Sequence, residues 1–281
     1  MTPQDTGADP STYSTDWLTL REPADAAARS TDLVDLLRGA LRVPARRTPL
    51  VLHDLGCGAG SMGRWLAPLL PGPQHWVLHD RDRDLLAVAA ARPGRPPSGA
   101  VTVETRYGAL GALTTGDLVG GDLVTASALL DVLTAGELEH VVAAVAGAGV
   151  PALFALTVAG RVALDPADPA DGVVVAAFNS HQRRRTGGRR LLGPAATGAA
   201  VAAFGRHGYT VTTRPSPWRL AGPKDAALVG RWLDGWLGAA ADQSARAVRP
   251  DYAAARREEA AQGRLGVVVE HIDLLATPPA S

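Results

Sequence analysis

The run VLHDLGCGAG at 51–60, followed by the segment WVLHD that ends at Asp80, constrains the fold more than any other part of the chain. An apolar strand leads into Asp54, and the glycines at 56, 58 and 60 then allow a tight turn close to a ligand. The segment SMGRWLAPLL can start a helix whose free N–H groups face a carboxylate or phosphate. Asp80 follows a second short strand, where a carboxylate can accept hydrogen bonds from ribose hydroxyls. The unit therefore predicts a site for a nucleoside-bearing cofactor.

Strands and helices alternate after this unit. The pattern predicts strands at 50–55, 75–79, 100–105, 122–127 and 151–157, and helices at 61–70, 82–91 and 135–147. This alternation favours an α/β fold with a parallel, doubly wound sheet and right-handed crossovers. After the fifth strand the rhythm changes, and the chain closes with the strands YTVTTR and RLGVVVEHIDLLA.

The chain divides into three expected parts. Residues 1–15 are polar and read as a mobile tail, and residues 16–48 as an N-terminal helical cap. Residues 49–281 are expected to form the cofactor-binding domain, with cap insertions at about 160–193 and 216–263. The second insertion carries Trp232 and Trp236 on one helical face, a pattern more typical of a packed core or interface than of a cofactor site. We expect this insertion to be either a substrate lid or a homodimer surface.

Charge and cysteine content narrow the function classes. The chain has 28 basic and 28 acidic residues, so no net charge draws it toward nucleic acid or an anionic membrane. Its one cysteine, Cys57, excludes an intrachain disulfide, and its place in the glycine turn is explained by small size. No His, Asp or Glu spacing predicts a metal site, and no apolar run has the length of a membrane span. We expect a cytoplasmic protein with a small-molecule substrate.

Two cofactors fit the glycine spacing. Gly58, Gly60 and Gly63 satisfy the G-x-G-x-x-G pattern of NAD sites. Three other features favour S-adenosylmethionine (SAM): Asp54 lies two residues before the first glycine, the glycines repeat at 56, 58 and 60, and two strands end the chain apart from the alternating half. With these features, the run resembles motif I (D-x-G-x-G-x-G) of the class I SAM-dependent methyltransferases.

The resemblance covers roughly 49–156 and implies a Rossmann-like sheet of seven strands whose last strand is antiparallel. DLVTASALLDVLT at 122–134 is similar to the family's fourth motif, which faces the transferred methyl group. The cofactor-binding residues so implied are Asp54, Gly56, Cys57, Gly58, Gly60, Asp80, Arg81, Ser127 and Ala128. The family often has an acid after the third strand that meets the adenine amine, but here that stretch is TRYGALGAL, which leaves the adenine contact open.

The residues expected to contact the methyl acceptor are chosen by their position in the chain. His181 is the candidate general base, because an imidazole titrates near working pH, although a polar helix end is also a common place for an inert histidine. Asp131, a candidate for substrate binding, follows the fourth strand, where its carboxylate could approach the sulfonium side of the cleft or could simply cap the next helix. The other candidates for substrate binding are Trp17, Arg21, Asn179, Trp218 and Arg219. We expect Trp17, His181 and Trp218 to enclose the substrate pocket.

These observations predict a SAM-dependent methyltransferase that acts on an O or N nucleophile of a small molecule. WLTLREPADAAARS, FNSHQ and SPWRL are similar to a bacterial group of class I methyltransferases, but they indicate no particular substrate. Three alternatives stay open. The arginines at 183–190 would suit a methyltransferase acting on RNA or protein, Gly63 would suit an NAD-dependent oxidoreductase, and a SAM-binding protein without catalysis fits the same glycine run.

Overall fold

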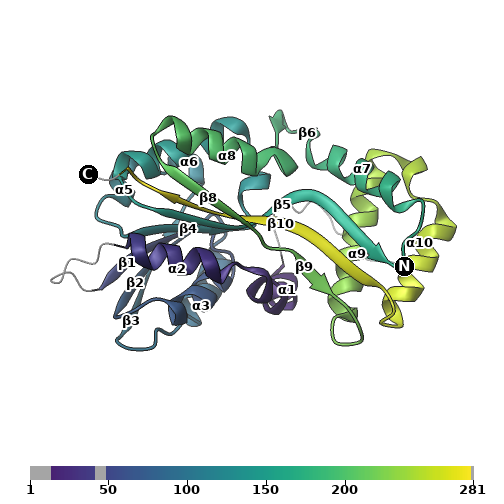
Figure 1. Ribbon diagram of the computed structural model, residues 1–281, viewed down its shortest axis with the longest axis horizontal. Helices are drawn as coiled ribbons and strands as arrows, with labels where there is room; N and C mark the ends of the chain where they lie inside the picture. The colour runs from purple at the N-terminus through teal and green to yellow at the C-terminus, as the bar shows by residue number, and fades with distance from the viewer. Residues whose placement is uncertain (1–13, 42–48, 280–281) are drawn as a thin grey trace.

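An eight-stranded sheet runs through the middle of the molecule (Figure 1). The computed structural model describes residues 14–41 and 49–279, so most of the predicted N-terminal tail and the end of the predicted helical cap lie outside the described residues. Seven strands follow the order β3-β2-β1-β4-β5-β10-β8, and β9 pairs with β10. Their bounds are β1 Leu50–Leu55, β2 Gln74–Asp80, β3 Val101–Tyr107, β4 Leu123–Ser127, β5 Ala152–Asp165, β8 Thr210–Pro215, β9 Trp218–Leu220 and β10 Gly266–Thr277.

The strand directions confirm the predicted fold class. Strands β1 to β5 pair in parallel, whereas β10 runs antiparallel between β5 and β8. The sequence-based prediction missed two features. Strand β5 continues well past residue 157, because β10 is long enough to pair with it as far as Asp165. The segment around Trp218 forms the extra strand β9, in register with Val269 of β10.

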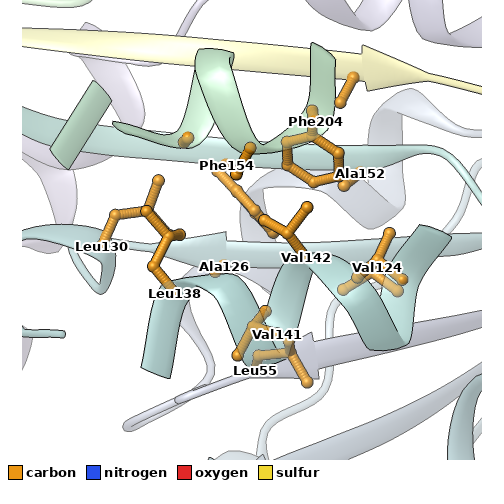
Figure 2. Close-up of a cluster of buried hydrophobic side chains, with 14 of the residues drawn as sticks. Leu55, Val124, Ala126, Leu130, Leu138, Val141, Val142, Ala152, Phe154 and Phe204 are labelled. Carbon is orange, nitrogen blue, oxygen red and sulfur yellow. The ribbon is translucent and has the colours of Figure 1, made fainter. Parts of the chain in front are cut away.

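Helices cover both faces of the sheet. Helices α2 (Thr31–Ala40), α3 (Ser61–Leu66) and α4 (Arg83–Ala91) pack on one face. Helices α5 (Thr115–Leu118), α6 (Ala135–Ala148) and α8 (Ala196–Arg206) pack on the other, and Figure 2 shows the apolar side chains between α6, α8 and the sheet, with Phe154 and Phe204 among them. Short 3₁₀ turns lie at Ala67–Leu69 (η1), Leu110–Ala112 (η2), Leu130–Val132 (η3), Gly193–Ala195 (η4) and Ala245–Ala247 (η5).

The far halves of β5 and β10 carry a separate lobe (Figure 1). Helices α7 (Asp171–Gln182), α9 (Ala226–Gln243) and α10 (Pro250–Ala261) pack there around their own apolar core, which includes Leu233 and Trp236. The short hairpin of β6 (Arg185–Thr186) and β7 (Arg189–Arg190) follows α7. Helix α1 (Thr15–Ala28) packs against both β9 and α3, and so connects the lobe to the cofactor-binding half.

Candidate active site

The turn between β1 and α3 favours glycine at three positions. Gly56, Gly58 and Gly60 have φ angles of 59°, 52° and 84°, a left-handed region that side chains rarely adopt. A Cβ at Gly60 would also lie 3.0 Å from the Cβ of Ala89 on α4. The turn is closed by the N–H of Cys57, which donates to the carbonyl of His79. The backbone therefore lies bare at the carboxyl end of β1, as close ligand approach requires.

Asp80, at the end of β2, fixes this turn. Its Oδ2 accepts a hydrogen bond from the N–H of Gly58 at 2.8 Å, and its Oδ1 accepts one from the N–H of Asp82 at 3.0 Å. Each carboxylate oxygen has further acceptor capacity, and Asp80 lines the large cavity described below. The carboxylate can therefore hold the turn and bind hydroxyl groups of a ligand together.

Asp54 lies beneath the turn and is fully buried. The hydroxyl of Thr125 donates to its Oδ1 at 2.7 Å, while Oδ2 has no hydrogen-bond partner among the described residues. Burial raises the pKa of this carboxyl to about 7, an effect that the Thr125 hydrogen bond and the positive charge of Arg29 oppose. Burial likewise raises the pKa of the Cys57 thiol, so the thiol stays protonated and is no nucleophile.

A cavity of about 1620 Å³ begins at the glycine turn and extends into the lobe. Every cofactor-site residue predicted from the sequence lines it except Gly60, which lies behind the turn against α4. Gly108, Ala109 and Leu110, which follow β3, add an apolar wall at the same end. Ser127 and Ala128 lie at the end of β4, where Ala128 has a φ of 51°. The structure thus gathers residues from the ends of four parallel strands at one end of one cavity.

Helix α1 is held against this site by buried polar contacts. Arg29 is 3% exposed, and its guanidinium donates to the hydroxyl of Ser127 at 2.9 Å and to that of Ser61 at 3.0 Å. Glu22 accepts two hydrogen bonds of 2.6 Å from Arg64, which also donates to a carbonyl of the turn. Arg29 was not predicted as a site residue, because a single arginine before the first strand carries no spacing signal.

The predicted aromatic wall differs from the one observed. Trp17 and Arg21 line the cavity, but Trp218 does not: it is 3% exposed and lies behind them. Its indole N–H donates to Oδ1 of Asp25 at 3.0 Å, and Asp25 also binds Arg21. Pairing of β9 with β10 turns Trp218 into the core of the lobe, so its predicted place in the pocket wall is wrong.

Two further candidates also lie away from the cavity. Asn179 donates from its side-chain amide to the carbonyl of Gly160 at 2.7 Å and so ties α7 to β5. Arg219 alternates with Trp218 along β9, and its side chain is exposed. Neither residue is among those that line the cavity. Asn179 and His181 are two positions apart on α7, so the rotation of the helix points their side chains in different directions.

Asp131 and His181 both line the cavity. Asp131 lies in η3 and does not cap α6, because Thr134 and Glu137 form the capping box of that helix. Burial raises the pKa of Asp131 to about 6. His181, near the end of α7, has its pKa lowered by burial and by Arg184, so its imidazole is neutral at pH 7. Its Nε2 lies 3.8 Å from the carboxylate of Asp242.

The sequence-based prediction missed the aromatic side chains of the lobe. Phe178, Trp232 and Trp236 line the cavity, and the two tryptophan rings stack with centroids 5.3 Å apart. Only Trp236 is fully buried, so the pair serves both the lobe core and the cavity wall. The spacing of the two tryptophans on one helical face is the available signal, but it predicts a packed core or an interface rather than a cavity wall.

The described residues show no arrangement for a metal ion and no membrane helix. Over 14–41 and 49–279, no three His, Cys, Asp or Glu side chains are grouped so that they could hold a metal ion. None of the helices described here is long and apolar enough to cross a bilayer.

Comparison with known proteins gives matches to solved structures only. No family model and no curated protein matches the chain. The solved structures include the cyclopropane synthase MmaA2 from Mycobacterium tuberculosis, with 14% identity, 94% of each chain covered and a TM-score of 0.46. A SAM-dependent methyltransferase from Geobacter sulfurreducens in complex with S-adenosyl-L-homocysteine shares 17% identity over 94% of this chain and 98% of that chain, with a TM-score of 0.43. Geranyl diphosphate C-methyltransferase from Streptomyces coelicolor A3(2) shares 11% identity over 98% of this chain and 89% of that chain, with a TM-score of 0.43.

The strand order, rather than these distant matches, defines the fold. Five parallel strands are followed by an antiparallel strand inserted before the edge strand, as the resemblance of the glycine run implies. The chain has the fold of the class I SAM-dependent methyltransferases.

Proposed function

We propose that the chain is a SAM-dependent methyltransferase that transfers a methyl group to an O or N nucleophile of a small molecule. The observation that carries the proposal is the cavity that joins the glycine turn to a chamber in the lobe, lined there by Phe178, Trp232 and Trp236 among other side chains. A donor and an acceptor bound at its two ends would meet beside the carboxyl end of β4. Direct displacement needs such a meeting, because its rate depends mainly on holding the two reacting atoms in line and close together.

The turn residues fit the donor. A bare backbone at Gly56 and Gly58 suits the methionine part of SAM, and Asp80 suits the ribose hydroxyls. The buried Asp54, with an oxygen that lacks a partner among the described side chains, suits the cationic groups of the ligand. Bound there, SAM would supply an electrophilic methyl group. Of the remaining cofactor candidates, Cys57, Arg81, Ser127 and Ala128 would contact it from the cavity wall, whereas Gly60 lies behind the turn.

The sheet topology argues against the NAD alternative. Dinucleotide-binding sheets of the Rossmann type have six parallel strands in the order 3-2-1-4-5-6. Here the antiparallel β10 takes the place beside β5, and β8 lies outside it. The glycine spacing that begins at Gly58 therefore lacks the sheet that normally accompanies it.

The arginine-rich hairpin of β6 and β7 does not favour a polymer substrate. Arg189 donates to both carboxylate oxygens of Glu137 at 2.8 and 3.0 Å, so one of its cations is paired within the cavity wall. The net charge of the chain is zero, which leaves no overall attraction for RNA. Both observations support a small molecule as the acceptor.

Calorimetry with SAM, S-adenosylhomocysteine and NAD tests the donor. We expect the first two to bind and NAD to fail. Asp80→Ala should weaken SAM binding by about 1–3 kcal/mol, because a carboxylate that binds hydroxyls is lost. Asp234→Asn, which changes an exposed carboxylate on α9 outside the cavity, is the control. Binding of NAD without S-adenosylhomocysteine would refute the proposal.

A further inference from the structure

The cavity wall beyond the glycine turn has a chemical character of its own. Its lobe end combines the aromatic rings of Trp17, Phe178 and Trp232 with polar side chains, among them Arg184 and Arg231. Aromatic rings in a cavity wall favour a ligand that carries a flat ring, because ring stacking adds to the burial of apolar surface. An acceptor that fills this end is therefore expected to carry an aromatic ring.

Asp131 is one of the acidic residues that line this cavity, and it lies in the loop that follows β4. It follows Leu129, whose Cδ1 would lie only 2.9 Å from a Cβ at Gly56, so the loop after β4 touches the glycine turn directly. The positive charge that lowers the pKa of Asp131 is that of Arg21, which is already bound by both oxygens of Asp25. Within the described part of the chain, Oδ1 of Asp131 has no hydrogen-bond partner. Such a buried acceptor needs a donor, which a ligand can supply.

From this geometry we infer that the acceptor is an aromatic compound whose nucleophilic O–H or N–H donates its hydrogen to the Asp131 carboxylate. The inference rests on the proposed function. In the transfer step the nucleophile forms a bond to the methyl carbon while the carbon–sulfur bond breaks. The electron pair of that bond stays on sulfur and gives a neutral thioether. The O–H or N–H proton passes to Asp131, which later releases it to solvent.

Asp131 is better placed for this role than His181. The histidine lies at the end of α7 in the lobe, where its Nε2 is 3.8 Å from Asp242 and its neighbour Arg184 points to the same region. Asp131 belongs to the loop that contacts the turn itself. Proton transfer requires the base to be within hydrogen-bond reach of the nucleophile, so position decides between the two.

Matched probes separate the ring from the donor group. With the full chain saturated with S-adenosylhomocysteine, calorimetry would compare 2-naphthol with 2-methylnaphthalene, which lacks the O–H, and with decahydro-2-naphthol, which lacks the aromatic rings. We expect 2-naphthol to bind at least tenfold more tightly than either. Equal binding of the three probes, or no binding of any, would overturn the inference. S-adenosylhomocysteine binding in the same experiment reports separately on the proposed function.

Variants then identify the proton acceptor. Asp131→Asn keeps the shape of the side chain and should remove most of the advantage of 2-naphthol, while 2-methylnaphthalene binding stays unchanged. In the wild type, 2-naphthol affinity should fall several-fold as pH drops from 7.5 to 5, since a phenolic O–H does not titrate in that range. Asp131→Asn should abolish this pH dependence, and Asp234→Asn should retain it. If His181→Gln abolishes it instead, the proton acceptor is the histidine and the inference fails.

Discussion

The buried Asp54 should make SAM binding release a proton. Its pKa is raised from 3.8 to about 7, so about half of the molecules carry a proton there at pH 7. A ligand cation beside the carboxylate favours the ionised form and lowers this pKa. Binding should then release about half a proton per SAM at pH 7, and affinity should rise about tenfold between pH 6 and pH 8.

Calorimetry at pH 7 in buffers of different ionisation enthalpy measures this release directly. Asp54→Asn should abolish it, whereas Asp131→Asn should retain most of it, because a group with a pKa of about 6 is largely ionised at pH 7. An apparent binding enthalpy that is the same in every buffer would refute the placement of Asp54 beside the ligand cation.

The same carboxyl has a consequence for stability. Because the folded-state pKa lies above the unfolded value, Asp54 contributes stability that is fully present below about pH 4 and is lost as pH rises through about 7. A shift of about three pKa units corresponds to about 4 kcal/mol. In chemical denaturation, the unfolding free energy of Asp54→Asn should therefore rise relative to that of the wild type between pH 5 and pH 8. Parallel pH profiles would contradict the assignment.

Two further substitutions test the packing around the site. Gly60→Ala should cost about 1–2 kcal/mol of unfolding free energy, because φ is +84° and the added Cβ meets Ala89 at 3.0 Å. Gly230→Ala on α9 is the control, because its added Cβ meets nothing within 4 Å in the described structure, and it should raise the unfolding free energy by up to about 1 kcal/mol. Urea titrations measure both changes, and equal effects would contradict the strain at Gly60. Trp218→Phe removes the 3.0 Å hydrogen bond to Asp25 and should cost about 1–2 kcal/mol while SAM affinity is retained; a large loss of SAM affinity would show that the indole belongs to the donor site.

The end of the cavity at the glycine turn could be predicted from the sequence because its constraints are local. The three glycines, Asp54 and Asp80 follow one another within one strand-turn-helix-strand unit, and their backbone roles depend on positions fixed by that unit. Strand boundaries there agree closely with the prediction. The interaction between Asp80 and the N–H of Gly58 was not anticipated, since it depends on side-chain rotation rather than on spacing.

The end of the cavity in the lobe could not be predicted in the same way. The sequence favours a pocket position for Trp218, because it does not reveal that SPWRL pairs with β10 as an extra strand. Once that strand forms, the indole turns into the lobe core, and the half-buried Trp232 from a distant helix lines the cavity wall. These relations depend on long-range pairing, for which one sequence carries no direct signal.

The separate apolar core of the lobe divides the chain into two units that meet along β5 and β10. Substitutions in the core of α7, α9 and α10 share few neighbours with those under the glycine turn, so their effects on stability should be additive. The lobe could therefore exchange its cavity-lining side chains for others without disturbing the donor site. A chain built in this way can change what it modifies while it keeps the reagent with which it does so.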